Sequence, residues 1–140
     1  MIKPLISVKN LSVEYITDTS PLKAVDDVSF EILPQEIFGL VGESGSGKST
    51  VVQAMMRILP PPAVISNGDV VINNEDIITA SKSDIIGFRW KKISIVMQSA
   101  LNALNPVLSV REQIHDVLNT HKGLIGKEAD ERAKELLSLV

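Results

Sequence analysis

A short run of glycines, one lysine and hydroxyl side chains has the spacing of a phosphate-binding loop. Gly42, Gly47, Lys48 and Ser49 occupy the fixed positions of the pattern Gly-x-x-x-x-Gly-Lys-Ser/Thr. Glycines let several backbone N–H groups converge on one phosphate. The lysine adds a positive charge for the β- and γ-phosphates, and the hydroxyl adds a magnesium ligand. The pattern predicts a P-loop, a site for a nucleoside triphosphate with magnesium.

The whole loop is assigned to this site. The expected cofactor-binding residues are Gly42, Glu43, Ser44, Gly45, Ser46, Gly47, Lys48, Ser49 and Thr50. Lys48 is also the first expected catalytic residue, and Ser49 the first expected metal ligand. The alternative is an ordinary glycine-rich surface turn before a helix, which the flanking pattern disfavours.

The flanking residues supply the elements that such a loop needs. Residues 37–41 are apolar without alternation, which predicts a strand buried on both faces. Residues 49–59 predict a helix, which the prolines at 60–62 would stop. Strand, glycine loop and helix together favour an α/β fold of the P-loop NTPase type.

Other patterns predict the rest of the fold. Before the glycine loop they indicate antiparallel strands around 11–15 and 28–32, a polar loop at 17–21 and a turn at 34–36. After the first helix they indicate a strand at 68–73 with a hairpin turn at 73–74, a short helix at 81–88 and a second buried strand at 93–97. The last part should contain a helix from a capping box at 109–112 to about 120, and an amphipathic helix from 127 onward. His115 and His121 are expected to be solvated residues in or beside the helix after 109.

Composition limits the possible partners. There are 14 Lys and Arg residues against 17 Asp and Glu, so no general basic field for nucleic acid exists. The absence of cysteine excludes disulfides and thiolate chemistry within these residues. Residues 1–5 lack the apolar region of a secretory signal, and no run of about 18 apolar residues occurs. We expect any membrane association to come through a partner.

Two further residues, taken together with the P-loop, make the sequence resemble a known family. Tyr15 lies on an early antiparallel strand, and Gln98 ends the later apolar segment. With the P-loop, this arrangement resembles an ABC transporter ATPase. The resemblance implies an ABC ATPase core with an N-terminal antiparallel β subdomain, and ATP and Mg²⁺ as cofactors. It also implies that Tyr15 stacks on adenine, and that Gln98 is a cofactor-binding, catalytic and metal-binding residue.

Two segments are similar to one branch of this family, the ATPase subunits of dipeptide, oligopeptide and nickel importers. They are residues 57–62 before 68–70, and residues 103–110, with Asn105-Pro106, after Gln98. Met97 stands where the family usually has an aromatic residue, and Ser99-Ala100 replace a commoner acidic-proline pair. Both departures lie where the membrane subunits are expected, so they leave the solute open.

The resemblance implies an ATP-binding subunit that couples ATP binding and hydrolysis to uptake of dipeptides, oligopeptides or a related solute. The implied partners are a second ATPase subunit, as a homodimer or heterodimer, integral membrane permease subunits and, indirectly, a solute-binding protein, but no nucleic acid. The implied location is cytoplasmic, on the inner face of the cell membrane through the permease. About 1–98 would form the β subdomain and P-loop core, and about 99–140 would begin the helical subdomain.

The family's hydrolytic elements are not found in these 140 residues. They are an apolar strand ending in Asp-Glu, a later histidine and a Ser-Gly-Gly signature. We therefore expect an N-terminal fragment that is inactive alone, although the full-length protein would be an ATPase. The alternatives are a soluble P-loop kinase or GTPase and a non-catalytic nucleotide-binding remnant. Few arginines are available for a kinase lid, and the guanine-reading Asn/Thr-Lys-x-Asp pattern is missing.

Overall fold

A computed structural model describes residues 3–89, 91–98 and 103–139 of the chain. It divides into two compact units, Met1–Ile86 and Gly87–Val140. Each unit is described separately below. Ser99 and Ala100, whose departure from the family pattern bears on the solute, lie outside the described residues. No helix in the described ranges is long and apolar enough to cross a membrane.

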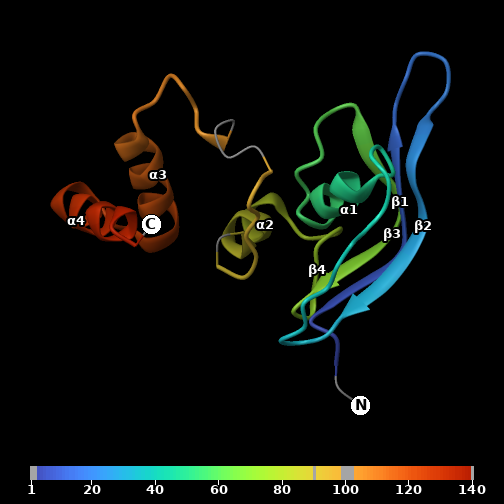
Figure 1. Ribbon diagram of the computed structural model, residues 1–140, viewed down its shortest axis with the longest axis horizontal. Coiled ribbons are helices and arrows are strands. Elements are labelled where there is room, and N and C mark those ends of the chain that lie inside the picture. Colours follow the sequence, from blue (N-terminus) through green and yellow to red (C-terminus); the bar gives the residue numbers. More distant parts are fainter. Residues whose placement is uncertain (1–2, 90, 99–102, 140) are drawn as a thin grey trace. The chain divides into compact units, whose positions relative to one another are not determined.

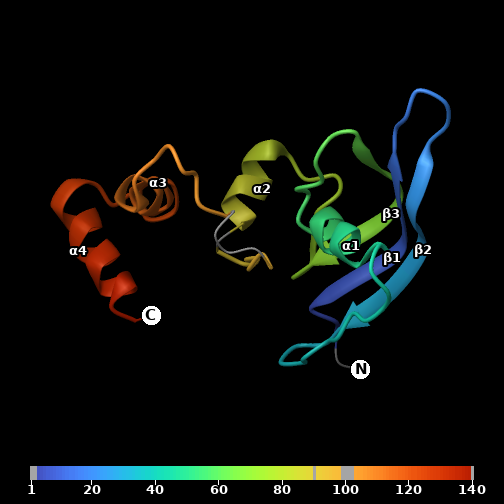
Figure 2. The ribbon, with the colours of Figure 1, turned by 45° about the horizontal axis from the view of Figure 1, so that its top comes forward.

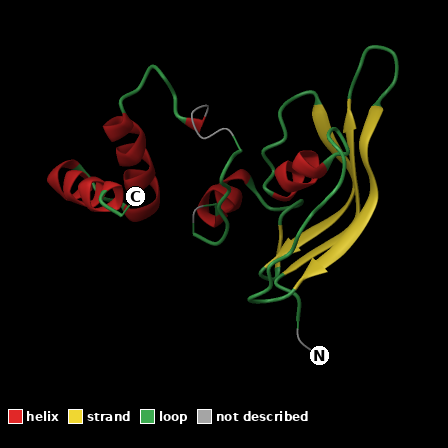
Figure 3. Ribbon diagram, in the orientation of Figure 1, coloured by secondary structure: helices red, strands yellow, loops and turns green. Residues whose placement is uncertain are grey.

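The first unit is built on a four-stranded antiparallel sheet of order β2-β1-β3-β4 (Figures 1 and 3). Its strands are β1 (Ile6–Tyr15), β2 (Leu22–Ile32), β3 (Ala63–Ile72) and β4 (Glu75–Asp76). The predicted antiparallel strands are thus confirmed. The predicted hairpin is also confirmed, because Asn73 and Asn74 turn between β3 and β4 with φ values of 50° and 67°.

One face of this sheet is buried, as strand alternation requires. Val8, Val13, Val70 and Ile72 are each at most 3% exposed. Helix α1 (Lys48–Met55) covers this face and contributes further buried side chains (Figure 2). Helix α1 begins directly after the glycine loop.

Two predicted strands are wrong. Residues 37–41 belong to no strand, and Ile37 and Val41 are 100% and 89% exposed. Residues 94–97 are likewise unpaired, with Val96 94% exposed, and Ile93 makes only an isolated bridge to Arg89. A strand buried on both faces needs a neighbouring strand and covering elements. Within the described ranges, no neighbouring strand pairs with either segment.

The second unit contains a helix pair, α3 (Val110–Lys122) and α4 (Gly126–Leu137). The predicted capping box is confirmed: Ser109 Oγ accepts a hydrogen bond from the Glu112 N–H, and the Glu112 carboxylate accepts one from the Ser109 N–H. Helix α3 ends at Lys122, close to the predicted end near 120, and Gly123 caps it with φ 68°. The predicted short helix forms as α2 (Lys82–Phe88), at the boundary between the two units.

Apolar packing and one ion pair hold α3 against α4. Leu118, Ala129 and Ala133 form a small buried core. Arg111 on α3 donates through Nε and Nη2 to both carboxylate oxygens of Asp130 on α4, at 2.6 and 2.8 Å. His115 differs from its prediction as a solvated residue, because it is half-buried and its Nε2 lies 2.9 Å from Asp130 Oδ1.

Candidate functional site

The glycine loop has a backbone path that side chains would obstruct. It runs from Gly42 to Gly47 and leads directly into α1. Gly45 and Gly47 have φ values of 80° and 86°, in the left-handed region that glycine enters without steric cost. A loop with this path can turn successive N–H groups inward as an anion-binding nest.

Gly47 also lies against the neighbouring strand. A β-carbon placed on Gly47 would meet the Ala24 carbonyl oxygen at 2.5 Å and Val25 Cγ2 at 3.5 Å. Both residues belong to β2. The last glycine of the loop is therefore required by backbone conformation and by close approach, as expected where a loop is fitted tightly to its scaffold.

Lys48 folds its side chain back over the loop. Its Nζ donates to the carbonyl oxygens of Gly42 and Glu43, at 2.8 and 2.5 Å, and to Ser46 Oγ at 3.2 Å. The ammonium group is thus held beside the same glycine loop that the sequence assigns to phosphate. A full positive charge at this position suits the β- and γ-phosphates of a nucleotide.

The N-terminus of α1 completes the anion site. Its cap residue, Gly47, contributes no side-chain hydrogen bond, and the first turn contains no acidic residue. Free N–H groups and the positive end of the helix dipole favour a bound phosphate at such a terminus. Ser49 is exposed and Thr50 half-buried in this first turn. The residues present therefore fit a polyphosphate, and Ser49 Oγ is available as an Mg²⁺ ligand.

The structure relates Tyr15 to the loop through the sheet. Tyr15 is the last residue of β1 and is half-buried. Two residues earlier, Val13 pairs with Val25, the β2 residue that lies beside Gly47. Tyr15 therefore lies two residues along β1 from the residue that pairs with the neighbour of Gly47. Gln98 is exposed and belongs to the other compact unit. The binding roles of both residues stay predictions.

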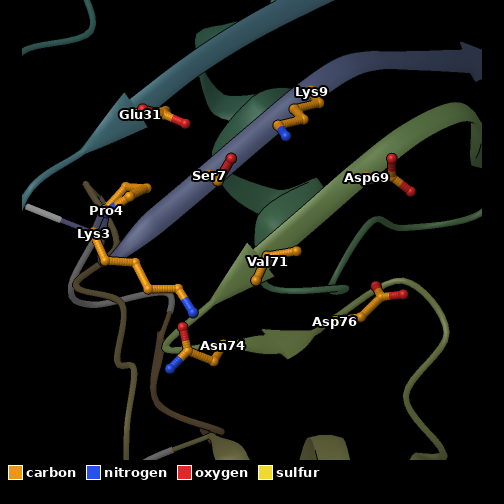
Figure 4. A pocket seen from close by; sticks show the side chains of 9 residues that line it. All are labelled: Lys3, Pro4, Ser7, Lys9, Glu31, Asp69, Val71, Asn74 and Asp76. Carbon is orange, nitrogen blue, oxygen red and sulfur yellow. The ribbon is translucent and has the colours of Figure 1, made fainter. Parts of the chain in front are cut away.

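A shallow hollow of about 330 Å³ lies on the opposite face of the sheet. Figure 4 shows its mixed lining, which includes Ser7, Lys9, Glu31, Asp69 and Asp76. Both signs of charge occur there, and no cluster of potential metal ligands is found in the described ranges.

Sequence reasoning missed Ala24, which lies beside the loop, and Arg57, which follows the far end of α1. Ala24 approaches Gly47 only because β2 folds beside the loop, and no local sequence pattern reports such a contact. Arg57 closes the C-terminal end of α1 with a left-handed φ of 50°. Glycine is the usual signal for that conformation, so an arginine there could not be recognised from the sequence.

Comparisons with known proteins agree with this geometry. Residues 25–140 match the family model described as ABC transporter. The chain is 43% identical to a Brucella abortus protein assigned as a peptide import ATP-binding protein, over 98% of this chain and 41% of that protein. It is 38% identical to the dipeptide transport ATP-binding protein DppD of Bacillus subtilis, over 97% of this chain and 41% of DppD. It is 35% identical to the oligopeptide transport ATP-binding protein OppD of the same organism, over 97% of this chain and 38% of OppD.

The fold also matches a solved structure, the ATP-binding cassette MJ0796 in a dimeric post-hydrolysis state bound to ADP and Pi. The TM-score is 0.77 at 25% identity, over 96% of this chain and 56% of that chain. The ABC ATPase-type fold with an antiparallel β subdomain is confirmed, and the kinase and GTPase alternatives are disfavoured. This chain spans about two fifths of the length of the curated relatives described above. With a family match over residues 25–140, the chain belongs to the ABC transporter family.

Proposed function

We propose that this chain is the nucleotide-binding part of an ATP-binding subunit in an ABC importer for peptides or a related solute. The nucleotide site is inferred from the glycine loop. Its last residue, Gly47, lies against Ala24, and the loop leads into the N-terminus of α1, which has no side-chain cap. The Lys48 ammonium lies beside this loop, and the backbone N–H groups and dipole of such a helix N-terminus supply the chemistry that a triphosphate requires.

Each proposed ligand has a distinct task. The loop from Gly42 to Gly47 binds phosphate oxygens through backbone N–H groups, and Lys48 balances the negative charge of the β- and γ-phosphates. Ser49 Oγ, with Gln98, would hold Mg²⁺, which neutralises charge on the phosphates when bound. Tyr15 would offer its ring to the adenine. Orientation and charge balance are the main contributions a protein makes to phosphoryl transfer.

The peptide class of solute is inferred from relatives named for peptide import, dipeptide transport and oligopeptide transport. The related cassette MJ0796 is dimeric, which supports a second ATPase subunit as partner. Permease subunits at the inner face of the cell membrane, and indirectly a solute-binding protein, would complete the importer. Residues 1–98 would contribute the β subdomain and P-loop core, and residues 99–140 the start of the helical subdomain.

Binding of Mg·ATP to the purified chain tests the nucleotide site. Lys48→Ala should weaken binding on the order of 10- to 100-fold, because hydrogen bonds to charged groups contribute about 1.5–3 kcal/mol. Titration calorimetry measures the change. Lys9→Ala is the matched control, since Lys9 lies in the hollow on the opposite face of the sheet and should leave the affinity unchanged. Equal affinities for wild type and Lys48→Ala would contradict the proposal.

Uptake of labelled peptides tests the importer assignment. Cells that depend on the full-length protein should take up dipeptides or oligopeptides with the wild-type protein and lose this uptake with Lys48→Ala. A normal level of protein in both strains is the required control. Peptide uptake that is the same in both strains, together with loss of an unrelated solute, would exclude the peptide assignment while leaving the nucleotide site intact.

A further inference from the structure

Arg57 occupies a backbone position that usually belongs to glycine. Helix α1 ends at Met55, rather than at Leu59 as predicted, and Arg57 follows with φ 50°. The Arg57 N–H donates to the Ala54 carbonyl at 2.9 Å, and the Ile58 N–H donates to the Gln53 carbonyl at 3.0 Å. These two bonds form a Schellman motif with Arg57 at its left-handed position. An L-residue with a side chain pays a conformational cost there that glycine avoids.

The side chain of Arg57 offsets this cost with contacts that glycine could not make. Its Nη1 donates to the carbonyl oxygens of Ile77 and Ala80, at 3.1 and 2.5 Å. The guanidinium therefore joins the end of α1 to carbonyl groups 20 and 23 residues further along the chain. Strained residues of this kind persist where the surrounding structure requires them, and they are concentrated near functional sites.

The turn that receives Arg57 is itself well anchored. Asp76 Oδ1 accepts a hydrogen bond from the Ile78 N–H at 2.8 Å, and Asp76 Oδ2 accepts one from the Thr79 hydroxyl at 2.6 Å. Ile77 is 2% exposed, and its N–H donates to the Val70 carbonyl of β3 at 2.8 Å. Arg57 is thus connected to the sheet through a rigid turn rather than a loose loop.

Helix α1 is consequently held at both ends by opposite sides of the same sheet. At its N-terminus, Gly47 lies against Ala24 of β2, the first strand in the sheet order. At its C-terminus, Arg57 is bound to the turn that follows β4, the last strand. The helix lies over the sheet between these anchors (Figure 2). Lys48 and Ser49 are in its first turn, so a tilt of the helix moves both.

We infer that Arg57 is a positioning residue for the phosphate site, which holds the axis of α1 so that Lys48 and Ser49 meet the nucleotide correctly. This inference rests on the proposed nucleotide-binding function. Small displacements of positioned groups reduce binding and catalysis strongly, because orientation must then be restored at the expense of binding free energy. Arg57 acts through α1 and is not itself a ligand in this proposal.

Arg57→Gly separates positioning from folding. Glycine keeps the left-handed turn and removes its conformational cost, which offsets the two lost side-chain hydrogen bonds, so the melting temperature should change little. Mg·ATP affinity should nevertheless fall about tenfold, because the C-terminal anchor of α1 is gone. Arg57→Lys retains one cationic donor and should restore part of the affinity. Asn73→Gly is the matched control: Asn73 also has φ 50°, but it lies in the β3–β4 hairpin, so affinity should not change.

Titration calorimetry and thermal unfolding on the four proteins decide between the outcomes. Arg57→Gly with wild-type affinity would overturn the inference while leaving the proposed function standing. A loss of affinity that only follows a loss of folded protein would overturn it as well, since it would show a purely structural role. No binding of Mg·ATP by the well-folded wild type would refute the proposed function itself, and the positioning role with it.

Discussion

The carbonyl oxygen of Ala24 lies 2.5 Å from the position that a β-carbon on Gly47 would occupy. Real β-carbons do not approach a backbone oxygen this closely, so one of the two segments would have to move. Gly47 also has φ 86°, which disfavours any other residue. The last residue of the glycine loop, Gly47, therefore packs closely against β2, directly before Lys48.

Gly47→Ala should abolish measurable nucleotide binding. The added methyl group forces the loop away from β2 and changes the backbone path that aims the N–H groups at phosphate. Titration with Mg·ATP is the measurement, and thermal unfolding shows how much of the effect is a loss of stability. Gly39→Ala is the control, because a β-carbon on Gly39 meets nothing within 4 Å. Retained binding in Gly47→Ala would show that the loop tolerates the displacement.

Tyr15→Ala should weaken ATP binding more than the binding of inorganic triphosphate. The proposed role of the ring is to stack on adenine, and triphosphate has no base to stack. Each base stacked on an aromatic side chain contributes about 1–3 kcal/mol in proteins that bind single-stranded nucleic acid, which corresponds to about a 5- to 150-fold loss of affinity. Tyr15→Phe keeps the ring and should bind ATP as the wild type does. Equal losses for ATP and triphosphate in Tyr15→Ala would remove the adenine role.

Local signals in the sequence predicted local structure well. The Asn73-Asn74 turn and the Ser109 capping box depend on side chains within a few residues, and both form as predicted. The glycine spacing predicted a loop whose left-handed residues are glycines. These features need no information from distant parts of the chain, which is why a single sequence reveals them.

Features that depend on distant partners were missed or wrong. The segment at 37–41 has the apolar run of a buried strand, but no strand pairs with it in the described ranges. Arg57 ends α1 early through carbonyl groups at 77 and 80. Asp130 lies four residues before Lys134 on α4, a spacing that favours an ion pair along the helix, whereas its carboxylate binds Arg111 on α3. Each outcome depends on whether a tertiary partner is present, which local propensity does not report.

The α3–α4 pair should lose stability in acid. Hydrogen bonds from Arg111 lower the pKa of Asp130 to about 2, from an ordinary value of 3.8. Because the folded state has the lower pKa, the ionised carboxylate stabilises folding above about pH 4, and this contribution disappears as the pH falls toward about 2. Thermal unfolding followed by helical circular dichroism should show the decrease.

Asp130→Asn identifies the responsible group. This variant should be less stable than the wild type near neutral pH and should lose less stability on acidification, since the titrating carboxylate is gone. Asp116→Asn is the matched control, because Asp116 is exposed on the same helix pair. An acid-induced loss of equal size in Asp130→Asn and wild type would assign the effect to other carboxylates.

The exposed apolar segment at 37–41 should make the chain self-associate. Ile37 and Val41 are 100% and 89% exposed, and an apolar segment with unpaired backbone groups can pair with the same segment of another copy. Sedimentation velocity should show oligomers that increase with concentration, and Ile37→Lys with Val41→Lys should suppress them. Val107→Lys is the control, because Val107 is 88% exposed in a turn before α3 and should have little effect. A monomer at high concentration would contradict this prediction.

The 140-residue chain should bind ATP without steady hydrolysis. Hydrolysis requires an acidic group at the metal and a group that orients water. The only Asp-Glu pair in the sequence is at residues 130 and 131, within helix α4. There Arg111 donates hydrogen bonds to both carboxylate oxygens of Asp130. Phosphate release should therefore equal that of Lys48→Ala at saturating Mg·ATP. Turnover that Lys48→Ala abolishes would show that these residues already contain a complete catalytic site.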